Sequence, residues 1–132
     1  MAPMKGYPMN LHDLASYDLI YLASPYSKYP TGIEQAFEDI SRIAARLLVK
    51  GLKVYSPIAH THPIAMHGNL DAFDHSIWLP FDQAIMKACS AMAVATMETW
   101  EQSFGIGEEI KFFKLATKPI FYIDPETLAV TQ

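Results

Sequence analysis

Hydrophobic positions along the chain form two patterns, short continuous runs and stretches with a helical period. The continuous runs are typical of buried strands. They cover residues 18–24, 52–57, 91–97 and 118–124. Between the first two runs, apolar side chains recur every three or four positions from Ile33 to Leu48, which predicts an amphipathic helix. Two more helices are predicted at residues 81–90 and 104–116.

Turn and capping residues mark the ends of these predicted helices. Thr31 and Glu34 have the spacing of a capping box, and Gly51 suits the position just after a helix end. The helix at 81–90 is expected to start near Pro80, which fits a first helical turn. The alternation of strands and helices predicts an α/β fold of flavodoxin or Rossmann type. Its sheet is expected to be doubly wound and mainly parallel, with four to five strands flanked by helices.

Two segments lie outside this alternation. Residues 1–17 have no period, and we interpret them as an N-terminal extension before a single domain that spans residues 18–132. Residues 57–80 hold four histidines and three prolines and are longer than a usual connection. They therefore either serve the function or contain a short helix, and we expect residues 58–75 to form a wall or lid of a cleft.

Length and composition exclude several classes of protein. The 132 residues suffice for one domain, and with 51% hydrophobic and 18% charged residues the chain is too apolar to be disordered. A net charge of −4 with only 10 lysines and arginines argues against binding to nucleic acids or membranes. No apolar run is long enough to span a membrane, and residues 1–16 lack the apolar core of a signal peptide, which favours a cytoplasmic protein. The single cysteine, Cys89, excludes an internal disulfide and is expected to be buried.

The loops that follow the strands are the expected ligand site. In an open α/β sheet, ligands bind at the carboxyl ends of the strands, which places residues 24–31, the histidine-rich segment and residues 97–105 around one cleft. Residues 103–110 read SFGIGEEI, and glycines at a helix start let the backbone approach an anionic ligand. The spacing is neither a dinucleotide fingerprint nor a P-loop. Glu108 and Glu109 point about 100° apart on a helix, so we expect only one to face the cleft.

Each candidate side chain also has an ordinary structural interpretation. The two glutamates and Asp82 could be ordinary acidic residues in the first turn of a helix, where they stabilise the helix dipole. Tyr21, in the first predicted strand, would either fill the core or reach the cleft from the strand's end. His60 and His62 would share one face of an extended segment, as metal ligands do, but no further ligand follows at a characteristic spacing. We therefore expect no metal and no other cofactor, and we expect His62 to hydrogen-bond the backbone or the ligand.

Three motifs of the chain, taken together, resemble a known enzyme family. They are IYLASPYS (20–27), WLPFDQAIMKACSAMAVA (78–95) and SFGIGEEI (103–110). They are similar to the opening strand and loop, the helix with a leading aspartate, and the S-x-G-x-G-x-E-[LI] signature of the nucleoside 2-deoxyribosyltransferase-like superfamily. This superfamily includes 2′-deoxynucleoside 5′-phosphate N-hydrolases and CMP N-glycosidases. The resemblance extends over residues 20–123, most of the chain.

The resemblance implies three catalytic positions. Glu109 matches the catalytic nucleophile, Asp82 matches the aspartate that assists at the leaving base, and Tyr21 matches the tyrosine that orients the nucleophile. This division of roles is chemically consistent. A carboxylate traps the oxocarbenium-like centre as a glycosyl-enzyme, and a second carboxyl group gives the leaving base its proton.

The resemblance also implies a cradle for a phosphate or for sugar hydroxyls. It consists of Ser103 and the amides around Gly105 and Gly107. In the opening loop, Ser24-Pro25 stands where relatives often carry Gly-Ser, so Ser27 or Lys28 is a further candidate for the phosphate contact. A second difference follows the signature, where relatives usually carry Gly-x-Ala and residues 111–113 read KFF.

The expected function is hydrolysis of the N-glycosidic bond of a (deoxy)nucleoside 5′-monophosphate through a glutamate nucleophile, with release of free base and sugar phosphate. Two alternatives are a nucleoside 2-deoxyribosyltransferase acting on free nucleosides and a non-catalytic nucleotide-binding module. A histidine-based metal hydrolase is a further alternative. The resemblance implies a homodimer or higher homo-oligomer, and Trp100, Phe112 and Phe113 are expected to be exposed at such an interface.

Overall fold

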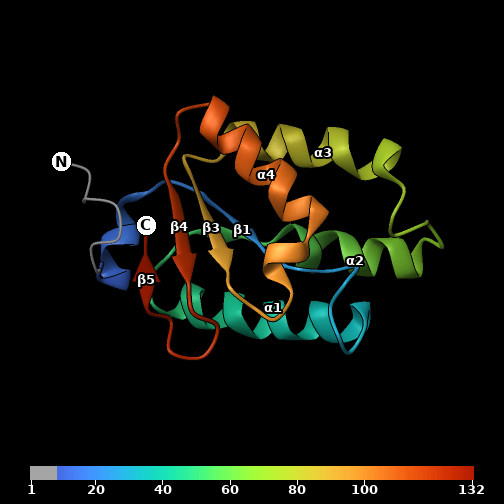
Figure 1. Cartoon of the computed structure of the whole chain (residues 1–132), viewed down its shortest axis with the longest axis horizontal. Helices are drawn as coiled ribbons and strands as arrows, with labels where there is room; N and C mark the ends of the chain where they lie inside the picture. The colour runs from blue at the N-terminus through green and yellow to red at the C-terminus, as the bar shows by residue number, and fades with distance from the viewer. Residues whose placement is uncertain (1–8) are drawn as a thin grey trace.

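A five-stranded sheet forms the centre of the protein in a computed structural model that describes residues 9–132 (Figure 1). Its strands are β1 (Ile20–Ala23), β2 (Val54–Tyr55), β3 (Ala91–Ala95), β4 (Ile120–Ile123) and β5 (Val130–Thr131). They lie in the order β2-β1-β3-β4-β5, with the first four parallel and β5 antiparallel to β4. The predicted α/β fold with a mainly parallel sheet is confirmed, and β5 is an addition to the strands read from the sequence.

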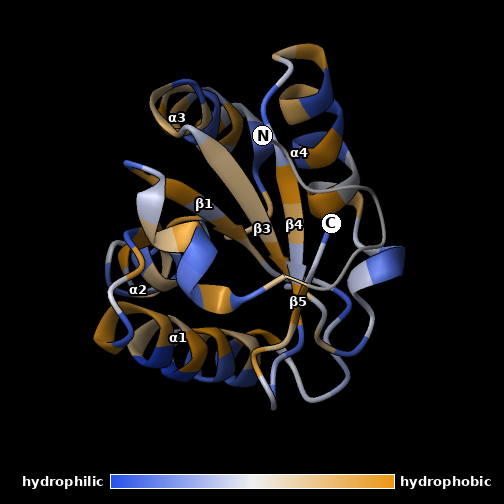
Figure 2. Ribbon diagram, turned by 90° about the vertical axis from the view of Figure 1, so that its left-hand side faces the viewer, coloured by the Kyte–Doolittle hydropathy of each residue, from blue (hydrophilic) through white to orange (hydrophobic). Residues whose placement is uncertain are grey.

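The helices cover both faces of this sheet. They are α1 (Ile33–Val49), α2 (Pro57–His67), α3 (His75–Ala88) and α4 (Phe104–Leu115), together with the short 3-10 helices η1 (Leu11–Ser16) and η2 (Trp100–Gln102). Figures 1 and 2 show α1 on one face and α3 and α4 on the other. The alternation of side chains along β1 follows these layers. Ile20 and Leu22 pack in the cluster that includes α1, whereas Tyr21 and Ala23 pack toward α3 and α4.

The predicted capping box at the start of α1 is wrong. Gly32 is the N-cap, with a φ of 99° that favours glycine, and no side chain caps the helix. Glu34 does not reach back to the helix start, because its carboxylate contacts His62 instead. At the other end of α1 the prediction holds, since Gly51 follows the C-cap Lys50 and has a φ of 91°.

The segment between β2 and β3 contains more helix than predicted. It folds as α2 and α3, which confirms that the histidine-rich segment contains a short helix. The expected helix start near Pro80 is wrong, because α3 begins at His75 and Pro80 lies inside it. Asp74 accepts a hydrogen bond from the Ser76 amide (3.0 Å) and so starts the helix earlier.

The amino-terminal residues that the structure describes contact the core. Met9 forms a bridge with Val130, and Leu14 of η1 is fully buried in the same cluster as Ile20. The rest of the expected extension, residues 1–8, lies outside the described residues. None of the helices within residues 9–132 is long and apolar enough to cross a membrane.

Three aromatic side chains that were expected to be exposed at an interface are buried or half-buried. Phe113 is fully buried against Tyr21, and Trp100 and Phe112 are half-buried in the same cluster. These three side chains are therefore part of the core beside α4 rather than an exposed surface. Cys89 is buried as predicted.

Candidate active site

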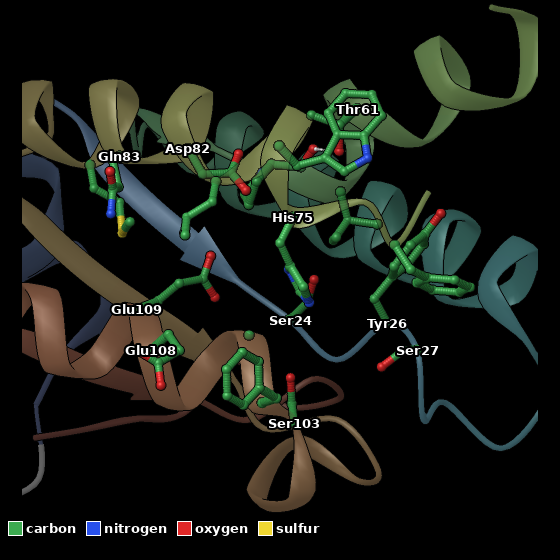
Figure 3. A pocket seen from close by; sticks show the side chains of 18 of the residues that line it. Ser24, Tyr26, Ser27, Thr61, His75, Asp82, Gln83, Ser103, Glu108 and Glu109 are labelled. Atoms are coloured by element: carbon green, nitrogen blue, oxygen red, sulfur yellow. Dashed lines mark hydrogen bonds between the residues drawn. The ribbon is translucent and has the colours of Figure 1, made fainter. Parts of the chain in front are cut away.

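A cavity of about 720 Å³ lies beyond the carboxyl ends of β1 and β3. The strand order reverses between these two strands, and this is where ligands bind in doubly wound sheets. The loop after β1, α2, α3 and the start of α4 form its walls (Figure 3). The three loops that the sequence placed around one cleft thus do contribute to a single cavity.

Glu109 and Tyr21 form the central contact of this site. Tyr21 is fully buried on β1 and donates a hydrogen bond from its hydroxyl to the carboxylate of Glu109, which lines the cavity from α4. Glu108 also lines the cavity, so the expectation that only one glutamate faces it is wrong. The two carboxylates nevertheless point in different directions (Figure 3), and that of Glu108 pairs with Lys111 at 3.2 Å.

Asp82 approaches the same region from the opposite wall, on α3 (Figure 3). It lies in the middle of α3, and Glu109 lies beyond the first turn of α4, so neither carboxylate is a first-turn acid. This excludes the helix-dipole explanation for both side chains. Within residues 9–132, the buried Oδ1 of Asp82 has no hydrogen-bond partner.

Burial makes both carboxylates weaker acids than usual. Loss of solvent raises the pKa of Asp82 to about 6. Loss of solvent also raises the pKa of Glu109 to about 8, against the opposing effect of the Tyr21 hydrogen bond and with a smaller contribution from the Asp82 charge. The pKa of Tyr21 is raised far above its usual value, first by burial and then by the Glu109 charge, so its hydroxyl remains a donor. Carboxyl groups perturbed in this way are typical of catalytic sites.

Small residues at the start of α4 form a second part of the cavity. Ser103 caps the helix by accepting from the Ile106 amide (3.2 Å), and Gly105 lines the cavity, where an added Cβ would meet only Ser103 Oγ at 3.8 Å. First-turn amides have no acceptor within their own helix and are available to a ligand. Gly107 does not take the predicted part in the cradle. It lies outside the lining, and its amide already donates to the Ser103 carbonyl (3.1 Å).

The serines after β1 face this part of the cavity. Ser24 is only 6% exposed, and its Oγ has no hydrogen-bond partner within residues 9–132. Ser27 lines the cavity near its exposed mouth. An unsatisfied buried hydroxyl that lines a cavity is a ready contact for a polar ligand.

His62 is buried at the edge of the cavity, and both of its ring nitrogens have partners. Nδ1 is hydrogen-bonded to the Tyr26 hydroxyl, and Nε2 lies 2.7 Å from Oε2 of Glu34. His60 is exposed and stacks on Phe81. The segment is helical and not extended, so the side chains of His60 and His62, two positions apart, point to different sides of α2. No group of three metal-ligating side chains is present within residues 9–132.

The remaining walls of the cavity are largely apolar. They are formed by Ile58, Ala65, Phe73, Trp78, Leu79, Phe104, Phe112 and Leu115. The Trp78 indole is held in place because its Nε1 donates to the Asp71 carbonyl (2.8 Å). Sequence reasoning missed Tyr26, His75 and Trp78 as lining residues, although the first two lie in segments that it assigned to the cleft. Aromatic walls with a few polar groups suit a planar heterocyclic ligand.

Comparison with known proteins identifies the family but no activity. No curated protein matches the chain. A family described as "Domain of unknown function (DUF1937)" matches residues 18–124, which is most of the chain. The protein therefore belongs to the DUF1937 family.

Proposed function

We propose that the protein hydrolyses the N-glycosidic bond of a (deoxy)nucleoside 5′-monophosphate. One observation carries the proposal: Glu109, held by Tyr21, and Asp82 face one partly apolar cavity from opposite walls. Cleavage of a glycosidic bond needs two such carboxyl groups, one at the sugar carbon and one at the leaving group. The resemblance of residues 103–110 to the deoxyribosyltransferase signature supports the same assignment.

In the first step, a carboxylate oxygen of Glu109 forms a bond to C1′ while the bond from C1′ to the base nitrogen breaks. The electron pair of the broken bond stays on the base, which takes a proton from the carboxylic acid of Asp82. The product is a glycosyl ester of Glu109 together with the free base. Tyr21 orients Glu109 in this step through its hydrogen bond.

In the second step, water attacks C1′ and Asp82, now ionised, takes one of its protons. The bond between C1′ and Glu109 breaks, and its electron pair returns to the carboxylate. The sugar leaves with a hydroxyl group at C1′, and both side chains regain their starting states. A second base in place of water would give a transferase reaction.

The pKa order of the two carboxyl groups runs against these roles. Values of about 6 for Asp82 and about 8 for Glu109 make the form with Asp82 protonated and Glu109 ionised the minor one, by roughly a hundredfold. Positive charge that develops at C1′ favours ionised Glu109 and offsets this order in the transition state. The roles are therefore assigned from the Tyr21 hydrogen bond and the motif, and not from the pKa values.

A panel of nucleoside monophosphates assayed by chromatography for free base tests the proposal. Glu109→Gln is expected to lower kcat/KM by at least ~10³-fold, whereas Glu108→Gln, which loses only its pair with Lys111, is expected to retain activity. Activity of Glu109→Gln above about a tenth of wild type would place the nucleophile elsewhere. Binding of nucleotides without any base release would favour a non-catalytic module.

Azide separates the roles of the two carboxylates. Added azide is expected to give a glycosyl azide of inverted configuration with Glu109→Ala, because azide takes the place of the missing nucleophile. With Asp82→Ala, azide is expected to attack the glycosyl ester and give the retained configuration. The reverse pattern would make Asp82 the nucleophile and Glu109 the acid, as the order of their pKa values favours.

A specific observation favours free nucleosides as a second candidate substrate. Lys111 is the single lysine or arginine that lines the cavity in the described chain, and it already pairs with Glu108. Against this, Ser24 and the α4 amides are donors that bind phosphate without a cation. A 5′-phosphate is therefore expected to raise kcat/KM by at least ~10²-fold, about 2.7 kcal/mol. Equal values for nucleotide and nucleoside at matched ionic strength would indicate a nucleoside deoxyribosyltransferase.

A further inference from the structure

Glu34, His62 and Tyr26 form a chain of hydrogen bonds from the surface to the cavity. The Glu34 side chain is 67% exposed at the start of α1, His62 is 3% exposed on α2, and Tyr26 lines the cavity. Nε2 of His62 lies 2.7 Å from Glu34, and Nδ1 is bonded to the Tyr26 hydroxyl. The Phe37 ring stacks on the imidazole at 4.8 Å and fixes its plane.

The chemistry of these groups fixes the direction of each hydrogen bond. A carboxylate only accepts, so Nε2 of His62 carries the proton and donates it to Glu34. In the neutral imidazole Nδ1 is then an acceptor, and the Tyr26 hydroxyl must donate to it. Burial raises the pKa of Tyr26 to about 12, with the Glu34 charge as a smaller cause, so the phenol keeps this proton at neutral pH. Tyr26 therefore has only its oxygen lone pairs left to offer a ligand.

The surroundings of Tyr26 suit the edge of a flat ring. The Phe73 ring lies 5.9 Å from the Tyr26 ring, and Trp78 contributes to the same cavity. Figure 3 shows Asp82 on α3 and Tyr26 in the loop after β1 in different parts of the cavity. Under the proposed function Asp82 gives its proton to the base as the glycosidic bond breaks. With the glycosidic side of the base near Asp82, the ring extends past Phe73 and Trp78 and its far edge reaches Tyr26.

We propose that Tyr26 is a specificity-determining residue that accepts a hydrogen bond from an amino group on the far edge of the base. His62 and Glu34 are positioning residues that keep Tyr26 an acceptor. The inference rests on the proposed function for the identity of the ligand as a nucleobase. A keto group at the same place would set two acceptors against each other, so the cavity selects amino bases over keto bases.

Binding measured by calorimetry tests this selection apart from catalysis. The ligands are two amino and keto pairs, the monophosphates of adenosine and inosine and those of cytidine and uridine, each with its free nucleoside. In the Glu109→Gln background the amino member is expected to bind about tenfold tighter. Tyr26→Phe should reduce this preference below about twofold, and Glu34→Gln should weaken it by about threefold, because an amide can also donate to Nε2.

Two matched variants control for general effects. Tyr29→Phe removes a hydroxyl from the same loop that bonds Asp39 (2.7 Å) outside the cavity, and Glu38→Gln makes the same change of charge on α1. Both are expected to leave the preference unchanged. Nitrogen-15 NMR of the free protein is expected to show His62 protonated on Nε2.

Each outcome bears on a different claim. His62 protonated on Nδ1 in the wild type, or equal affinity for amino and keto bases, would overturn the inference and leave hydrolysis standing. If amino bases bind more tightly, this preference depends on Tyr26, and the wild type releases no free base, then hydrolysis alone is overturned. Absence of binding by all of these ligands would overturn both.

Discussion

Replacing Glu109 by glutamine is expected to stabilise the folded protein at alkaline pH. Burial raises the pKa of Glu109 from 4.5 to about 8, so the folded state holds this proton more tightly than the unfolded chain. The resulting stability is complete below about pH 4.5 and is lost as the pH rises through about 8. Glutamine stays neutral throughout, and its carbonyl still accepts the hydrogen bond from Tyr21.

The size of the effect follows from the same pKa shift. A rise to about 8 corresponds to at most about 5 kcal/mol. Relaxation around the charged group lowers this value, so we expect Glu109→Gln to unfold with about 2–4 kcal/mol more free energy than wild type at pH 9. Near pH 5 the two proteins are expected to differ by less than about 1 kcal/mol.

Urea denaturation followed by tryptophan fluorescence at pH 5, 7 and 9 measures this difference. Glu108→Gln is the matched control, because it removes a carboxylate from the neighbouring position that is 41% exposed and pairs with Lys111. Its effect is expected to stay below about 1 kcal/mol at every pH, as is usual for an exposed pair. Equal free energies of unfolding for wild type and Glu109→Gln at pH 9 would refute the claim that burial destabilises the ionised form of Glu109.

Four further substitutions test other parts of the structure. Gly105→Ala and Gly107→Ala are each expected to raise the free energy of unfolding by about 0.5–1 kcal/mol, because the new methyl group meets only Ser103 Oγ at 3.8 Å in the first case and no atom within 4 Å in the second. Only Gly105→Ala should raise KM, by about tenfold, since its methyl group enters the cavity; equal KM values would contradict the placement of the ligand. Tyr21→Phe removes the hydrogen bond that lowers the pKa of Glu109. Because the active form has Glu109 ionised and Asp82 protonated, against their pKa order, the falling limb of the kcat/KM profile near pH 8 follows Glu109 and should move to higher pH with a lower maximum; an unmoved falling limb would exclude Tyr21 as the partner. Leu14→Ala should lower the free energy of unfolding, measured by urea denaturation, by about 2–5 kcal/mol. A loss below about 1 kcal/mol would show that η1 contributes little to the core.

The fold was largely predictable because its elements have clear periods. The buried runs that became β1 and β3, and the amphipathic period of α1, depend on local sequence alone. The errors arose where tertiary contacts override local signals. Glu34 suits a capping box but contacts His62 instead, and Pro80 suits a helix start but lies inside a helix that Asp74 caps earlier. The strand β5 has only two residues and no period to detect.

The candidate site was predictable as separate residues but not as an arrangement. Tyr21 and Glu109 are 88 positions apart, and their hydrogen bond depends on how β1 and α4 pack together. The bond between His62 and Glu34 spans 28 positions and joins α2 to α1. Sequence reasoning selected His62 as a hydrogen-bonding residue, but it had no signal for either partner. Long-range pairs of this kind follow from topology and register, which a single sequence does not encode locally.

Several features that reduce stability lie in the cavity. Ser24 Oγ and Asp82 Oδ1 are buried without partners in the described chain, and each such atom costs about 1–3 kcal/mol. Three more unpartnered atoms belong to Tyr55, Thr99 and Gln132, outside the cavity lining. The pKa of Tyr55 is nevertheless raised by burial and then by the charge of the nearby Asp82 carboxylate, and Asp82 and Glu109 in the cavity both have a pKa raised by burial. Nearby, Lys118 shows how fully this fold can satisfy polar groups, since it donates to three carbonyls at the end of α3. Unsatisfied and charge-destabilised groups that persist in one cavity favour a functional role for it.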